Sequence, residues 1–122
     1  MVAEYVPDAG DLIKVDFRSG RSSSERVGHE QAGWRPTLVL SPRRYNKKTG
    51  LAVVVPVTNA IKGYPFEVDL PAGVKIGGTI LSDAVRSIDW RERHAKYFEK
   101  APAEVLRNVQ ARLAALLGLS KP

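Results

Sequence analysis

The chain offers few side chains that can act as nucleophiles, acids, bases or metal ligands. It has no cysteine and only two histidines, His29 and His94. Neither histidine stands in a His-Glu-x-x-His run and no Gly-x-Ser-x-Gly sequence is present, which disfavours a tight zinc or di-iron site and an elbow-type serine nucleophile. Metal-free acid–base or electrostatic chemistry on a phosphodiester, without a cofactor, stays open to a small set of residues: His29, Glu30, Arg35, Thr58 and Asp83.

The balance of charge favours an anionic partner. Lys and Arg number 19 against 13 Asp and Glu, which gives a formal net charge of +6. The segment 41–66 holds five of the bases and no acid. We expect one positive patch on the surface, because a site that follows a phosphate backbone requires one. A solvated basic hairpin that only keeps the protein soluble explains the charge equally well.

The elements that position these residues are predicted to be short strands within a single domain, residues 1–122. Alternating or short apolar runs predict strands over 11–17, 37–40, 51–57, 66–70, 79–81 and 85–90. Residues 45–50 have the composition of a turn, so the strands on either side are predicted to form a hairpin. Pro56 cannot donate to a ladder, so that end of its strand is expected at an edge or a bulge. Residues 18–33 are expected to form a long loop.

The C-terminal segment has a different pattern. Apolar residues recur at three- and four-residue steps between 105 and 117, after Pro102 and before Gly118, which predicts one amphipathic helix. The whole is therefore expected to be mainly β with a C-terminal α-helix, in a small antiparallel sheet or open barrel. Trp90 is expected in the core, whereas Trp34 fits either the core or an exposed stacking face.

No apolar run reaches the roughly 18 residues that cross a bilayer, and the N-terminus lacks the pattern of a secretion signal. We therefore expect a cytoplasmic protein with no membrane partner.

Several motifs, in order along nearly the whole chain, resemble those of the MazF/PemK family of toxin endoribonucleases. The segments that carry the resemblance are GHEQAGWRP at 28–36, LSP at 40–42, YNKKTG at 45–50, VPVT at 55–58 and KGYPFEV at 62–68. The resemblance implies a small SH3-like barrel of short antiparallel strands that forms a homodimer. It also implies sequence-specific cleavage of single-stranded mRNA without metal, which leaves a 2′,3′-cyclic phosphate and a 5′-hydroxyl and halts translation. A cognate MazE-like antitoxin with an acidic segment is the implied partner.

The resemblance places the family's catalytic arginine on Arg35 and its catalytic threonine on Thr58. A guanidinium can neutralise the negative charge that builds on a phosphorane, so Arg35 is expected to act as an electrostatic clamp and proton donor more than as a base. The Thr58 hydroxyl is expected to bind a phosphate oxygen. Without the motifs, a surface ion pair and an ordinary strand residue explain these two positions better.

The remaining assignments from the resemblance concern acid–base chemistry and RNA contact. His29, Glu30 and Asp83 are candidates for the acid, the base or the positioning of RNA. Leu81 stands where the plasmid-borne branch has an arginine, so the acid–base assignment stays open. RNA contacts are expected from Gln31, Asn46, Lys47, Lys48, Asn59, Lys62 and Arg86. Turn chemistry and solubility explain residues 46–48 almost as well.

Two other functions are weighed against the nuclease. One is a non-catalytic toxin of the same fold that poisons DNA gyrase, and the absence from such toxins of the Gly-x-Arg-Pro and Val-Pro-x-Thr motifs favours the nuclease. The other is a basic RNA-binding module without turnover.

Overall fold

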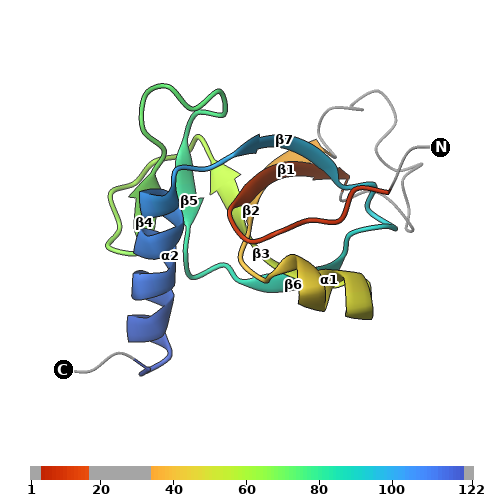
Figure 1. Cartoon of the computed structure of the whole chain (residues 1–122). Helices are drawn as coiled ribbons and strands as arrows, with labels where there is room; N and C mark the ends of the chain where they lie inside the picture. Colours follow the sequence, from red (N-terminus) through yellow and green to blue (C-terminus); the bar gives the residue numbers. More distant parts are fainter. Residues whose placement is uncertain (1–3, 17–33, 120–122) are drawn as a thin grey trace, which may run out of the picture.

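The computed structural model describes residues 4–16 and 34–119 and contains seven strands and two helices (Figure 1). The predicted loop 18–33 lies outside these residues. The elements, in chain order, are β1 (Asp11–Asp16), β2 (Trp34–Val39), α1 (Arg43–Thr49), β3 (Leu51–Thr58), β4 (Glu67–Asp69), β5 (Thr79–Leu81), β6 (Arg86–Asp89), β7 (Lys96–Lys100) and α2 (Ala103–Leu116).

All strands pair antiparallel, in the order β4-β5-β3-β2-β1-β7, with β6 also paired to β3. The predicted class, mainly β with a C-terminal helix in a small barrel-like sheet, is confirmed. Within the described residues the outer strands β4 and β7 do not pair with each other, so the sheet is open. No helix in this part of the chain is long and apolar enough to cross a membrane.

Strand β3 is the centre of the sheet, and Pro56 divides one of its sides. Its first half, Leu51–Val54, pairs with β6, and its last two residues pair with β5. Pro56 falls between these two ladders. On the opposite edge of β3, Pro56 is paired with Thr37 of β2. Because Pro56 has no backbone N–H, this interruption leaves no donor without a partner.

The core has two parts because successive side chains of a strand point to opposite faces. One face packs against α2, whose Val105 and Val109 are buried against Leu12, Leu38 and Val55 among others. The other face buries Ile13, Val15, Val39, Val54, Ile88 and Trp90. Trp90 is only 2% exposed, as expected for a core residue. The terminal helix is also confirmed, with Pro102 at its N-terminal boundary and Gly118, at φ +74°, just beyond its end.

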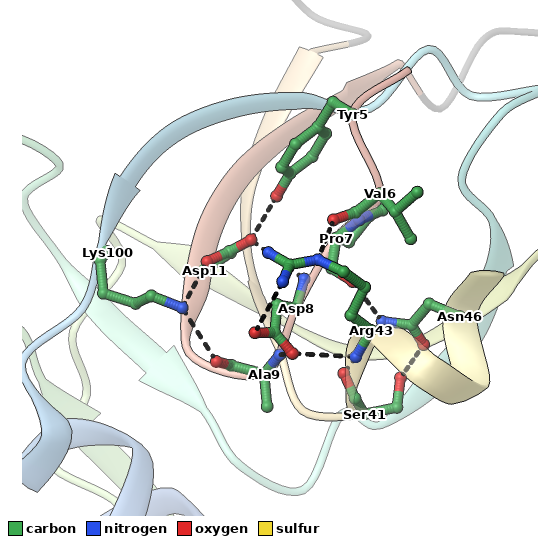
Figure 2. Close-up of polar contacts among 10 residues, drawn as sticks. All are labelled: Tyr5, Val6, Pro7, Asp8, Ala9, Asp11, Ser41, Arg43, Asn46 and Lys100. Carbon is green, nitrogen blue, oxygen red and sulfur yellow. Dashed lines mark hydrogen bonds and ion pairs between the residues drawn. The ribbon is translucent and has the colours of Figure 1, made fainter. Parts of the chain in front are cut away.

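Two elements differ from the sequence predictions. The predicted turn at 45–50 is the last part of helix α1, which ends at Gly50 with φ +76°. Its single buried residue, Asn46, holds the helix to the sheet: its amide nitrogen donates to the carbonyls of Pro7 and Ser41, and its amide oxygen accepts from the Ser41 hydroxyl (Figure 2). Strand β7 was not predicted, because it lies at the sheet edge and its residues are mostly exposed.

A polar cluster around Asp11 fastens the N-terminal segment to β7 (Figure 2). The Asp11 carboxylate is buried, accepts from the Tyr5 hydroxyl at 2.5 Å and pairs with the Lys100 ammonium at 2.7 Å. Burial, reinforced by the hydrogen bond to Asp11, raises the pKa of Tyr5 above its usual value. Asp8 continues the cluster to α1, because its carboxylate accepts the backbone N–H of Arg43 at 2.8 Å.

Candidate active site

Arg35 lies in β2 near the end at which that strand begins, opposite Val15 of β1. Its side chain is exposed and makes no ion pair with another described residue. The flanking residues Trp34 and Pro36 point to the opposite face of the sheet, because side chains alternate along a strand. A guanidinium in this position is open to an anion from solvent.

Thr58 ends β3, the strand next to β2. The recorded pairing of these strands runs from Val39↔Val54 to Thr37↔Pro56. When this register is continued by two residues, Arg35 falls opposite Thr58, and both belong to the face of the sheet that carries Thr37 and Pro56. The Thr58 hydroxyl accepts the backbone N–H of Ala60 at 3.1 Å, and its proton remains available for donation to a phosphate oxygen.

A groove of about 460 Å³ opens beside Thr58. Asp83, in the turn between β5 and β6, lies on the same groove, as does Lys62 from the segment that follows β3. Three residues singled out from the sequence, Thr58, Lys62 and Asp83, therefore share one cavity. Its wall also includes Leu81, the position at which the resemblance departs from an arginine.

The far wall of the groove is built by residues that the sequence analysis did not single out. The Glu67 carboxylate accepts the backbone N–H of Lys62 at 3.2 Å and that of Gly63 at 2.9 Å, which fixes the segment carrying the lysine. The rings of Tyr64 and Phe66 stack with centroids 5.3 Å apart, and Tyr64 is half-exposed. Their only sequence signal is the motif at 62–68. They give the groove an aromatic surface beside a lysine, a combination that suits an unpaired base and its phosphate.

Gly78 supports the other side of Thr58. A Cβ atom at Gly78 would lie 2.5 Å from the Thr58 carbonyl oxygen and 3.1 Å from Oδ1 of Asn59. The next residue, Thr79, pairs with Thr58 across the ladder and is completely buried. Its hydroxyl has no hydrogen-bond partner among the described residues. The position of Thr58 thus depends on a glycine, because any side chain at 78 would displace it.

The other predicted RNA contacts are not brought together with this groove. Asn46 is fully buried and its side chain holds α1 to the sheet, so it offers no exposed surface for the predicted RNA contact. Lys47 and Lys48 are exposed in α1, just before β3 begins, whereas Thr58 ends that strand eight residues later. A strand of this length spans roughly 25 Å, so the predicted single positive patch is divided between two ends of the sheet (Figure 1).

Two more predicted residues lie nearer to Thr58. Asn59 follows it directly and is exposed. Arg86 lies in β6 opposite Val54, on the other side of β3 from β2. His29, Glu30 and Gln31 lie outside the described residues. Within residues 4–16 and 34–119, no three side chains of His, Cys, Asp or Glu form a group that could hold a metal ion.

This open antiparallel sheet, with an arginine and a threonine at adjoining strand ends, has the architecture of a known class of toxin. The model of the PemK-like, MazF-like toxins of type II toxin–antitoxin systems matches residues 8–117, and the chain belongs to this family.

The similarity extends to particular members of the family. The endoribonuclease toxin MazF of Escherichia coli K12 is 48% identical over 118 residues, which cover 97% of this chain and all of that protein. Escherichia coli endoribonuclease PemK is 38% identical over 112 residues, 85% of this chain and 84% of PemK. In a crystal structure of MazE-MazF from Deinococcus radiodurans, one chain matches with a TM-score of 0.83 at 47% identity and covers 96% of this chain and 100% of that one. These relatives favour the nuclease, and nothing in them supports the gyrase alternative.

Proposed function

We propose that this protein is an endoribonuclease toxin that cleaves single-stranded mRNA at a specific sequence and so blocks translation. The observation that supports the proposal most is the register of β2 and β3, which pairs Thr37 with Pro56 and, if continued, sets the exposed Arg35 opposite Thr58, a residue that lines a groove. The relatives named endoribonuclease toxin MazF and endoribonuclease PemK support it. We further propose that the protein acts in the cytoplasm.

Cleavage proceeds by attack of a ribose 2′-oxygen on the adjacent phosphate, which forms a 2′,3′-cyclic phosphate and releases a 5′-hydroxyl. Negative charge accumulates on the phosphorane, where the Arg35 guanidinium provides a fixed positive charge and two donors. The Thr58 hydroxyl donates to a phosphate oxygen. Asp83 lies on the same groove and is a candidate to position the RNA or to move a proton. No metal ion takes part in this scheme.

A cleavage assay in EDTA tests the proposal. Mixed-sequence single-stranded RNA should give discrete products that end in a cyclic phosphate, and sequencing of the 5′-hydroxyl ends should reveal one short cleavage sequence. Arg35→Ala should slow cleavage by about 10²–10³-fold, the usual effect of losing a transition-state donor. Arg44→Ala, which removes an exposed arginine on α1, is the matched control and should cleave normally. Intact RNA, or equal rates for the two variants, contradicts the proposal.

We also propose that the protein is a homodimer neutralised by a MazE-like antitoxin with an acidic segment. The last turn of α2 and the residues after it expose Leu116, Leu117 and Leu119 by 61–73%, which is apolar surface that a second subunit can cover. The crystal structure that pairs MazE with MazF supports the antitoxin. Sedimentation of only a 13 kDa species at micromolar concentration would contradict the dimer.

A further inference from the structure

A second, larger groove lies on the face of the sheet opposite Arg35. Its volume is about 680 Å³, and none of the described residues that line it is acidic. Residues from three strands and from the segment between β4 and β5 form its walls. The side chains that characterise it are three lysines and two aromatic rings: Lys14, Trp34, Lys75, Lys96 and Phe98.

The lysines are held close together by the fold. Lys14 of β1 and Lys96 of β7 are direct cross-strand partners, an arrangement that costs stability because like charges face each other. Lys75 lies in the segment between β4 and β5, and Glu99 of β7 fastens that segment by accepting the backbone N–H of Ile76 at 2.9 Å. An anion bound in the groove would relieve the repulsion between Lys14 and Lys96.

The aromatic rings lie directly beside these charges. The Lys14 ammonium is 4.5 Å from the centre of the Phe98 ring, and the Lys96 ammonium is 5.1 Å from that of Trp34. Phe98 is 37% exposed. An unpaired nucleotide offers a phosphate to such ammonium groups and a flat base to such rings, and proteins that bind single strands combine these two features.

The groove and the candidate active site meet at the same end of β2. Trp34 and Pro36 line the groove, and Arg35 between them faces the other side of the sheet. The groove and Arg35 therefore adjoin along β2, on opposite faces of the sheet. An acidic peptide would satisfy the lysines, but this nearness to the arginine proposed to be catalytic favours RNA.

We propose that this groove, lined by Lys14, Trp34 and Lys96, is a second RNA-contact site that binds unpaired nucleotides flanking the cleaved bond, an assignment that rests on the endoribonuclease function proposed above. Its effect is on affinity for long single strands, and it takes no part in the chemical step.

The test uses RNAs with a 2′-deoxy nucleotide at the cleavage position, so that binding is measured without cleavage. One RNA carries only the cleavage sequence and a second adds unpaired flanks. The Lys14→Gln/Lys96→Gln variant should bind the flanked RNA about tenfold more weakly and the short RNA normally. If two phosphate contacts are lost, the slope of log K against log salt should become shallower by about 1.4, since each contributes about 0.7 for a single strand. Trp34→Leu should weaken binding of the flanked RNA by about 5- to 100-fold, the range for loss of one stacked base.

The matched control is Arg44→Gln/Arg107→Gln, which removes the same charge from exposed positions on α1 and α2 and should leave the preference for flanked RNA intact. Folding is checked by thermal melting. The Lys14→Gln/Lys96→Gln variant removes the facing like charges but also the contacts of these ammonium groups with Phe98 and Trp34, so its melting temperature should stay close to that of the wild type. Equal losses for both RNAs, or equal effects of the two double variants, overturn the proposal. It also fails if the groove variants weaken binding of a Glu-rich peptide while binding of RNA is unchanged. A wild type that binds flanked RNA more tightly but cleaves none refutes the nuclease and leaves this site standing.

Discussion

Replacing Gly78 with alanine should displace Thr58 and slow RNA cleavage. The added Cβ would lie 2.5 Å from the Thr58 carbonyl oxygen. A close carbon–oxygen contact is about 3.3 Å, so one of the two strands must move by roughly 0.8 Å. Because a misplacement of about 1 Å at a reacting group can cost 10²-fold in rate, we expect cleavage to slow by about 10- to 100-fold.

The same substitution also has a conformational cost. Gly78 has φ +122°, a backbone conformation that alanine adopts at a cost of about 1–3 kcal/mol. Alanine substitutions at two nearby glycines distinguish this conformational cost from the steric clash with Thr58. Gly73 has φ +102° with nothing within 4 Å of its Cβ position, and Gly77 has neither a positive φ nor a close neighbour.

Urea unfolding and RNA cleavage, measured on all three alanine variants, complete this test. Gly77→Ala should change the free energy of unfolding by no more than about 1 kcal/mol. Gly73→Ala should lower it by about 1–3 kcal/mol and leave the cleavage rate of the folded protein unchanged. Gly78→Ala should lose more stability than Gly73→Ala and alone should lose activity. If Gly78→Ala and Gly73→Ala had equal stability and both cleaved normally, the close packing of Gly78 against the Thr58 carbonyl would not be what positions Thr58.

Three other substitutions have measurable consequences for stability. Thr79→Val should raise the free energy of unfolding in urea by about 1–2 kcal/mol, because it removes a buried hydroxyl that lacks a partner; a loss of stability would show that the hydroxyl is satisfied. Asn46→Ala should lower it by about 2–4 kcal/mol through loss of three side-chain hydrogen bonds, and a neutral result in the same assay would exclude the anchoring role. Tyr5→Phe should cost about 1–2 kcal/mol at pH 7. Because the pKa of Tyr5 is raised in the folded protein, its neutral form stabilises the fold below pH 10, and this contribution is lost as the pH rises above 10. Above pH 10 the Tyr5→Phe variant should therefore lose less stability than the wild type. Parallel pH profiles of the two proteins would contradict this.

The parts of the fold that the sequence predicted are those with a strong local pattern. Alternation in 11–17, β-branched residues in 51–57 and helical spacing in 105–117 each led to the correct element. Helix α1 was missed because its seven residues have no apolar stripe and are held by one buried side chain, Asn46. That side chain bonds to Pro7, 39 residues away, which no local pattern can reveal.

The candidate site was predictable only in part for a related reason. Arg35 and Thr58 stand in recognisable motifs, but their juxtaposition depends on the register of β2 and β3. Lys47 and Lys62 look like one charged segment in the sequence, although the strand between them carries them to different ends of the sheet. The facing pair of Lys14 and Lys96 is 82 positions apart and arises from the ladder alone.

The interruption at Pro56 also explains why a cavity exists beside Thr58. A β3 strand with a complete set of amides could bind one long neighbour along its whole free side, and that neighbour would leave no room for a hollow. Because pairing stops at the imino acid, β5 and β6 are separate short strands, and the chain between them leaves the ladder beside Pro56 and carries Asp83 to the groove. In the function proposed above, RNA would reach Thr58 through the space that this break in the ladder leaves beside β3.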